Sequence, residues 1–140
     1  MTVRMELGER GYDILLERGC LKRAGELLSL DRKVLIVTDD GVPEEYAKNV
    51  AAACRTPVVA TVPQGEASKS FPVLETLLSK MLSEGFTRSD CVAAVGGGVV
   101  GDLSGLAAAL YTTARSVKIC SMPGRTRRRR SWRRPAASPI

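Results

Sequence analysis

A triple glycine at residues 96–98 ends an apolar run in this 140-residue chain. Residues 91–111 read CVAAVGGGVVGDLSGLAAALY, an order typical of a strand, a glycine turn and the start of a helix. The first amides of a helix lack intrahelical acceptors, and the helix dipole favours an anion beside them. Glycine reaches positive φ at low cost and lets a ligand approach the backbone closely. The segment therefore predicts a site for nucleotide phosphates at Gly97, Gly98 and Gly101.

Asp102 follows these glycines and is a candidate ligand of a different kind. A carboxylate would repel a phosphate placed directly on it, so sugar hydroxyls or a polar group at the nicotinamide end suit it better. Two structural alternatives remain open. Asp102 could simply cap the helix, and the glycines could form a tight turn with close packing, because their spacing is not a strict G-x-G-x-x-G.

A second candidate loop reads PQGEASKS over residues 63–70. Gly65 permits an unusual backbone turn. Glu66 can accept two hydrogen bonds from ribose hydroxyls, and Lys69 supplies a cation for phosphate or substrate. The alternative is a solvated loop in which Ser70 caps the next helix.

Asp39 is the third candidate, at the end of the β-branched run VLIVT over residues 34–38. An acid at the end of a central strand is often a ribose ligand in dinucleotide-binding folds. The alternative is a turn formed by Asp39-Asp40-Gly41.

Strand-like and helix-like segments alternate along the chain and must position these loops. We expect a hairpin from the runs 2–7 and 12–16, and strands and helices in alternation after it. The strands are expected at 34–38, 58–62 and 91–95, and the helices at 20–29, 43–54, 70–85 and 102–111. This pattern predicts an α/β fold, a Rossmann-like parallel sheet flanked by helices, in which the three loops lie together at the carboxyl ends of the strands.

Composition limits the other possibilities. No run of about 18 apolar residues and no signal peptide is visible, so we expect a cytoplasmic chain without a membrane partner. The sequence holds four cysteines in no C-x-x-C pair, and no histidine, so we expect reduced thiols and no metal site.

Charge divides the chain into two parts. Residues 1–114 hold 12 Lys and Arg and 15 acids, whereas residues 115–140 hold nine Lys and Arg and no acid. We assign residues 1–111 to the α/β domain and residues 112–140 to a divergent, disordered basic tail.

Taken together, VTD at 37–39, PQGEASKS at 63–70 and GGGVVGDLSGLAAALY at 96–111 resemble the N-terminal domain of 3-dehydroquinate synthase. The wider sugar-phosphate cyclase superfamily shares the pattern loosely. The resemblance covers roughly residues 2–111 and implies a shikimate-pathway enzyme that converts a heptulosonate 7-phosphate to 3-dehydroquinate and phosphate. It implies bound NAD, with Asp39 and Glu66 on ribose hydroxyls, Lys69 near the nucleotide, and Gly97, Gly98 and Gly101 on the pyrophosphate. Asp102 would contact the cofactor near the nicotinamide.

The family resemblance also implies a homodimer and a C-terminal domain that binds zinc or cobalt through a glutamate and two histidines. The motifs that follow the Ala-rich helix in that family are absent after Tyr111, and the chain has no histidine. We therefore expect no catalytic residue of this enzyme within the chain, and a fragment inactive alone. A frameshift or truncation that replaced the family's continuation would explain the tail.

Two other functions remain open. The chain could belong to another sugar-phosphate cyclase. The Arg-rich tail could instead bind nucleic acid nonspecifically through salt-sensitive phosphate contacts and stacking on Trp132, although a solvated tail is the interpretation we favour. The arginines concerned are Arg125, Arg127, Arg128, Arg129, Arg130, Arg133 and Arg134.

Overall fold

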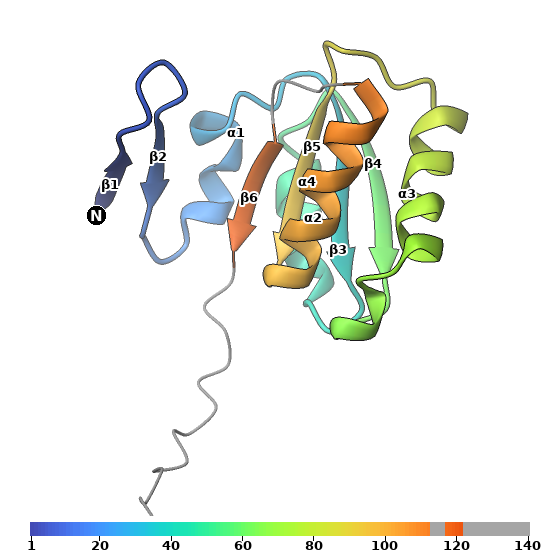
Figure 1. Ribbon diagram of the computed structural model, residues 1–140. Coiled ribbons are helices and arrows are strands. Elements are labelled where there is room, and N and C mark those ends of the chain that lie inside the picture. The colour runs from blue at the N-terminus through green and yellow to red at the C-terminus, as the bar shows by residue number, and fades with distance from the viewer. Residues whose placement is uncertain (113–116, 122–140) are drawn as a thin grey trace, which may run out of the picture.

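The computed structural model describes residues 1–112 and 117–121, and the side chains of residues 1–111. In the described part, two short strands precede a run of alternating helices and strands (Figure 1). The elements are β1 (Thr2–Met5), β2 (Tyr12–Leu15), η1 (Cys20–Arg23), α1 (Ala24–Leu27), β3 (Lys33–Asp39), α2 (Glu44–Ala51), β4 (Thr56–Val62), η2 (Glu66–Ser68), α3 (Phe71–Ser83), β5 (Cys91–Gly96), α4 (Gly98–Thr112) and β6 (Val117–Ser121).

The four later strands form one parallel sheet in the order β4-β3-β5-β6. Strand β3 is central: Val34–Val37 are fully buried on both faces, as expected for a β-branched run in a parallel sheet. Its register pairs Asp39 with Val62 of β4 and Thr38 with Val95 of β5. All four carboxyl ends therefore meet at one edge, the lower edge in Figure 1.

The chain changes direction across the sheet at β3. After β3 it moves outward to β4 through α2, and then returns past β3 to β5 through α3. Right-handed crossovers in opposite directions place their helices on opposite faces. One core cluster accordingly joins α3 and α4 to the sheet, and a second joins α1 and α2 to its other face. The carboxyl ends of β3 and β5 flank the point where the strand order reverses, which is where open α/β sheets bind ligands.

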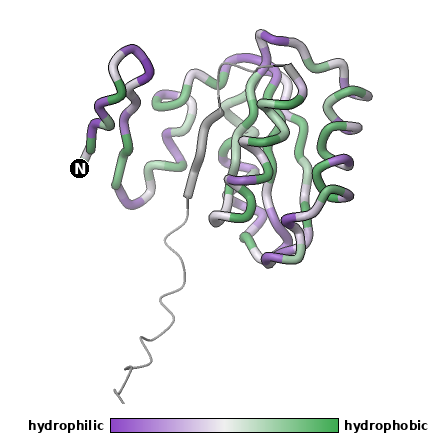
Figure 2. The backbone as a smooth tube through the Cα atoms, in the orientation of Figure 1, coloured by the Kyte–Doolittle hydropathy of each residue, from purple (hydrophilic) through white to green (hydrophobic). Residues whose placement is uncertain are grey.

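The hairpin β1–β2 stands beside this layered body. It pairs Val3 with Ile14 and Met5 with Tyr12 in antiparallel register. Hydrophobic and hydrophilic residues alternate along it, in contrast to the continuously hydrophobic strand β5 (Figure 2). All four of these side chains are exposed, so the hairpin adds little to the core of the described chain.

The expected fold class is confirmed: helices flank a parallel sheet, and an antiparallel hairpin precedes it. Two elements differ from the expectation. The helix predicted over 20–29 is a 3₁₀ turn followed by a single α-helical turn, because Gly25 lies in its middle and Ser29 adopts a positive φ of 48°. Helix α4 begins at Gly98 rather than at residue 102.

The division of the chain at residue 111 stays a prediction, and the structure describes one strand beyond that boundary. Val117–Ser121 form β6, which pairs in parallel register with β5 from Val92 to Gly96. Its backbone thus extends the sheet beyond Tyr111. The arginines from Arg125 to Arg134 and the remainder of the predicted tail lie outside the described residues. In the described part of the chain, no helix combines the length and hydropathy needed to cross a membrane.

Helix α3 offers a direct test of this packing. Leu77 is 1% exposed in the core against the sheet, whereas Leu82 on the same helix is 71% exposed. We expect Leu77→Ala to lower the free energy of unfolding by about 2–5 kcal/mol through the lost contacts and the cavity. Leu82→Ala should change it by less than about 0.5 kcal/mol. Urea unfolding followed by circular dichroism measures both, and equal losses would contradict the assigned packing.

Cys54, at the end of the α2 region, allows a test of burial by pH. Burial, assisted by the nearby Cys91, raises the pKa of the Cys54 thiol to about 11. Because the thiolate is the reactive form, alkylation by iodoacetamide should stay slow at pH 8 and accelerate only as the pH approaches 11. In guanidinium the unfolded chain should react with the ordinary thiol pKa of about 8.5. Mass spectrometry of the Cys54 peptide reports the rate. Equal rates at pH 8 for folded and unfolded protein would refute the burial.

Candidate functional site

An ion-pair cluster connects the loop before α3 to helix α4 at the carboxyl edge of the sheet. The Nζ of Lys69 lies 2.8 Å from Asp102 Oδ2 and 3.3 Å from Glu66 Oε2. The hydrogen bond to Asp102, and next the one to Glu66, raises the pKa of Lys69 above its ordinary value, so the ammonium is charged at neutral pH. Two carboxylates around one ammonium leave a net charge of about −1. The cluster therefore suits hydroxyl donors better than a bare phosphate.

Local backbone geometry holds Glu66 and Lys69 in place. Gly65 adopts φ 99° and ψ 167°, a conformation that L side chains rarely adopt, and the 3₁₀ turn η2 starts directly after it. The buried hydroxyl of Ser68 donates to the carbonyl oxygen of Pro63 and closes this loop on itself. Ser70 occupies the N-cap position of α3, but its side chain makes no capping hydrogen bond. The expected serine cap is thus absent.

The glycines after β5 have different roles. A Cβ on Gly96 would lie 2.9 Å from Cγ2 of Val100, so this glycine is required by packing. A Cβ on Gly97 or Gly98 would meet nothing within 4 Å, so the space over these two residues is open. None of the three adopts a positive φ, so close approach by a ligand, rather than backbone conformation, is the property they provide.

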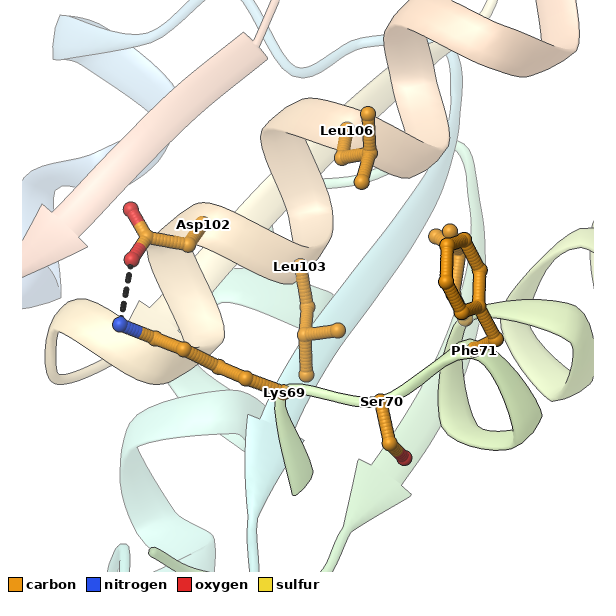
Figure 3. Close-up of a pocket in the computed structure, with 7 residues that line it drawn as sticks. Lys69, Ser70, Phe71, Asp102, Leu103 and Leu106 are labelled. Atoms are coloured by element: carbon orange, nitrogen blue, oxygen red, sulfur yellow. Dashed lines mark ion pairs between the residues drawn. The ribbon is translucent and has the colours of Figure 1, made fainter. Parts of the chain in front are cut away.

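Helix α4 starts within the glycine motif, which changes the roles of its later residues. The N–H of Gly101 donates to Gly97 O at 3.1 Å, so this amide is already used and Gly101 offers only its missing side chain. The amides of residues 98–100 lack intrahelical acceptors. Asp102 lies beyond the first turn of α4, which excludes its role as the helix cap, and its carboxylate faces Lys69 (Figure 3).

Asp39 and Asp40 order the ends of β3 and β4. Oδ1 of Asp39 accepts the N–H of Gly41 at 2.9 Å, so the turn that the sequence offered as an alternative does form. Oδ1 of Asp40 accepts the N–H of Gln64 at 2.9 Å, and the N–H of Asp40 donates to Val62 O. Asp40 therefore connects two of the candidate loops. Its sequence signal, a second acid in a turn, did not distinguish it from solvated residues.

Two cavities open at this edge, on opposite faces of the sheet. The first, about 250 Å³, lies on the α3–α4 face and is shown in Figure 3, with the Lys69–Asp102 pair at one end and Phe71 and Leu106 at the other. The second, about 400 Å³, lies against α2 and includes Asp39. The structure thus places Glu66, Lys69 and Asp102 in one cluster and Asp39 in a separate cavity, with the glycine turn at the same edge.

This arrangement, a parallel sheet with an open glycine turn and acidic side chains at its topological switch, is typical of dinucleotide-binding α/β domains. Solved structures of sugar-phosphate cyclases share the fold. A 2-deoxy-scyllo-inosose synthase complexed with carbaglucose-6-phosphate, NAD⁺ and Co²⁺ aligns with a TM-score of 0.71 at 19% identity, over 88% of this chain and 34% of its own. A 2-epi-5-epi-valiolone synthase from Streptomyces hygroscopicus subsp. jinggangensis, with NAD⁺ and Zn²⁺ bound, aligns with a TM-score of 0.63 at 27% identity, over 85% and 34%.

Sequence comparisons narrow the class. The family described as 3-dehydroquinate synthase N-terminal matches residues 59–126. The 3-dehydroquinate synthase of Rhizobium leguminosarum bv. trifolii is 42% identical over 129 residues, and that of Brucella ovis is 41% identical over 132. These alignments cover 87% and 88% of this chain and 34% of each relative. The chain belongs to the 3-dehydroquinate synthase family through its N-terminal domain, and it spans about a third of the length of these relatives.

The family match continues past Tyr111 to residue 126, in agreement with the position of β6 in the sheet. The family-like part of the sequence therefore extends beyond the boundary expected at residue 111.

The resemblance implies two bound groups, a dinucleotide and a metal ion, and the residues present suit only the first. The open backbone over Gly97 and Gly98 fits a dinucleotide pyrophosphate. A zinc or cobalt ion does not fit: the sequence has no histidine, and among residues 1–111 no group of three metal-ligating side chains converges.

Mutation can distinguish Gly96, which packing requires, from Gly97, over which the space is open. Gly96→Ala should lower the free energy of unfolding by about 1–3 kcal/mol, because the stiff Val100 side chain must shift to admit the methyl group. Gly97→Ala should leave it within about 0.5 kcal/mol. Thermal unfolding by calorimetry measures both. A stable Gly96→Ala protein would disprove the tight contact.

Proposed function

We propose that this chain is the NAD-binding part of a 3-dehydroquinate synthase. The observation that carries the proposal is the open backbone over Gly97 and Gly98 at the start of α4, located at the topological switch beside the Lys69 cluster. Bound NAD would accept a hydride from a substrate alcohol and later return it. The chain's own residues bind and orient the cofactor.

The proposed contacts follow from the local chemistry. The unpaired amides at the start of α4 would hold the pyrophosphate, with Gly97, Gly98 and Gly101 giving it room. Glu66, held by Lys69, would accept hydrogen bonds from a ribose. Asp102 would act near the nicotinamide, where its charge does not face phosphate. Asp39 keeps Oδ2 for the other ribose while Oδ1 is engaged with Gly41.

The substrate class follows from the family. The substrate would be a heptulosonate 7-phosphate, converted to 3-dehydroquinate and phosphate, and the full-length protein would act as a homodimer. Another sugar-phosphate cyclase is the second candidate, supported by the shared fold of the inosose and valiolone synthases. We favour the first because 41–42% identity joins this chain to curated 3-dehydroquinate synthases.

NAD⁺ binding to the whole chain tests the cofactor site. Isothermal titration should detect weak binding, because one domain leaves the cofactor partly uncovered. Gly97→Ala should weaken it roughly tenfold, because the added methyl group occupies the space proposed for the pyrophosphate and keeps it from one hydrogen bond to the backbone. Gly105→Ala is the matched control, since a Cβ there also meets nothing within 4 Å but lies two helical turns from the site. Equal losses in both variants, or no binding to the parent chain, would refute the proposed site.

Catalysis by the isolated chain is the second test. We expect no formation of 3-dehydroquinate from the heptulosonate 7-phosphate, with or without added Zn²⁺ or Co²⁺, because the sequence offers no histidine for the metal site that the family resemblance implies. A coupled assay for phosphate release measures turnover. Metal-dependent activity of the 140-residue chain would overturn this expectation.

A further inference from the structure

The cavity against α2 carries negative charge that no lining residue compensates. It lies between α2 and the carboxyl ends of β3 and β4, has a volume of about 400 Å³, and we call it the acidic cavity. Of its charged lining residues, Lys48 and Glu44 cancel each other, because they form an ion pair at 2.8 Å. Asp39 and Asp40 therefore leave a formal charge of about −2, which favours a cationic occupant.

Thr38 is an independent sign that the acidic cavity takes a hydrogen-bonding ligand. The residue lines the cavity, is only 6% exposed, and its Oγ1 has no hydrogen-bond partner among the described residues. Buried hydroxyls in native proteins are nearly always paired. As an acceptor beside two carboxylates, Oγ1 suits a ligand that combines several N–H donors with a positive charge.

A guanidinium group fits this combination. It presents N–H donors in a planar fork, stays charged at neutral pH, and can bind a carboxylate through two hydrogen bonds at once. Val42 and Val59 provide apolar walls for the aliphatic part of an arginine side chain. An anion is disfavoured, because the two aspartates repel it.

The chain itself supplies guanidinium groups in excess. The loops at the carboxyl edge, residues 39–43, 63–70 and 96–102, hold four acids, one lysine and no arginine. Residues 125–134, which we call the Arg-rich segment, hold seven arginines and no acid. The edge and the segment are thus complementary in charge. The sequence alone favours a solvated segment, because the acidic cavity exists only in the folded chain.

The end of β6 brings the Arg-rich segment within reach of the acidic cavity. Ser121, the last residue of β6, pairs with Gly96 of β5 at the carboxyl edge, and β3 is the next strand (Figure 1). Adjacent strands lie about 4.8 Å apart, so the end of β6 is roughly 10 Å from Asp39 across the edge. Arg125 and Arg130 follow four and nine residues after Ser121, and these lengths of chain span up to about 13 Å and 30 Å when extended.

We propose that the acidic cavity is the docking site for the Arg-rich segment of the same chain, with a guanidinium group hydrogen-bonded to Asp39, Asp40 and Thr38 Oγ1. Each ion pair is weak alone, but a short tether gives an effective concentration in the millimolar range, which populates the contact. Bound there, the segment would cover the acid that the proposed function assigns to a ribose. The contact does not need NAD, so its failure leaves the proposed function standing.

Trp132, the only tryptophan of the sequence, belongs to the Arg-rich segment and allows a test in the full chain. Its fluorescence anisotropy at low salt should fall as NaCl is raised to about 0.5 M, because salt screens the ion pairs. Asp39→Asn/Asp40→Asn should show the low anisotropy at every salt concentration. Asparagine keeps the Oδ1 acceptors for the N–H groups of Gly41 and Gln64, so the loops stay in place.

Asp31→Asn/Asp90→Asn is the matched control, because it removes the same two charges just before β3 and β5, at the opposite edge of the sheet. It should keep the anisotropy and the salt dependence of the parent chain. Equal anisotropy in the parent and in Asp39→Asn/Asp40→Asn would overturn the proposal. Anisotropy that rises with protein concentration would also overturn it, since the contact would then join separate copies.

Affinity for RNA provides a second measurement. Arginines engaged in the acidic cavity are withheld from phosphates, so Asp39→Asn/Asp40→Asn should bind polyuridylate about fivefold more tightly than the parent at low salt, as expected when one or two ion pairs are released. Asp31→Asn/Asp90→Asn measures the part of this gain that comes from net charge alone. Equal affinities of the two double variants would show that the arginines are already free for nucleic acid and would refute the docking.

Discussion

Parallel pairing of β3 between β4 and β5 is the constraint on which the rest of the structure depends. Because β4 and β5 both pair with β3 in parallel, the chain must cross a face of the sheet between consecutive strands, and here it does so through a helix each time. The crossovers on both faces bury Val34–Val37 completely. The outward and return crossovers then leave α2, with α1, on one face of the sheet and α3 with α4 on the other. Both cavities at the carboxyl edge result from this reversal.

The glycine motif shows how one short segment satisfies packing and binding at once. Val100 occupies the space that a side chain on Gly96 would need. Val100 is fully buried and holds the first turn of α4 against the sheet. Ser104 continues this anchoring, since its buried hydroxyl donates to Val100 O at 2.6 Å. The next glycines leave their side-chain space empty toward solvent. A rigid helix start is thereby exposed to a ligand without distorting its backbone.

Much of the fold could be predicted from the sequence, because β3, β4 and β5 each have a clear hydrophobic run and α3 has a clear helical period. The loops of the site could be located for the same reason, since they follow predicted strands. The start of α4 could not be predicted, because its first turn consists of Gly98, two valines and Gly101. Glycine is a poor helix former, so the sequence of this turn does not indicate a helix. Strand β6 was missed because each of its residues pairs with a residue of β5 that lies 25 positions earlier, and no local sequence pattern indicates such a pairing.

Side-chain roles within the loops were less accessible than the loops themselves. Nothing in PQGEASKS indicates that Lys69 turns toward Asp102, which is thirty-three positions away. The unpaired hydroxyl of Thr38 and the bridging role of Asp40 likewise depend on tertiary proximity. Sequence therefore gave the residue types that could contact a nucleotide, and the structure was needed to divide them between two faces.

The shared ammonium of Lys69 has an evolutionary consequence. A neutral replacement of Lys69 would leave two carboxylates facing each other across the space it vacates, and loss of either acid would leave the ammonium with one partner. The loop that carries Glu66 and Lys69 is separate in sequence from the helix that carries Asp102. A substitution in one segment therefore calls for a compensating substitution in the other. Among homologous chains, Glu66, Lys69 and Asp102 should accordingly behave as one inherited unit that is retained or replaced together.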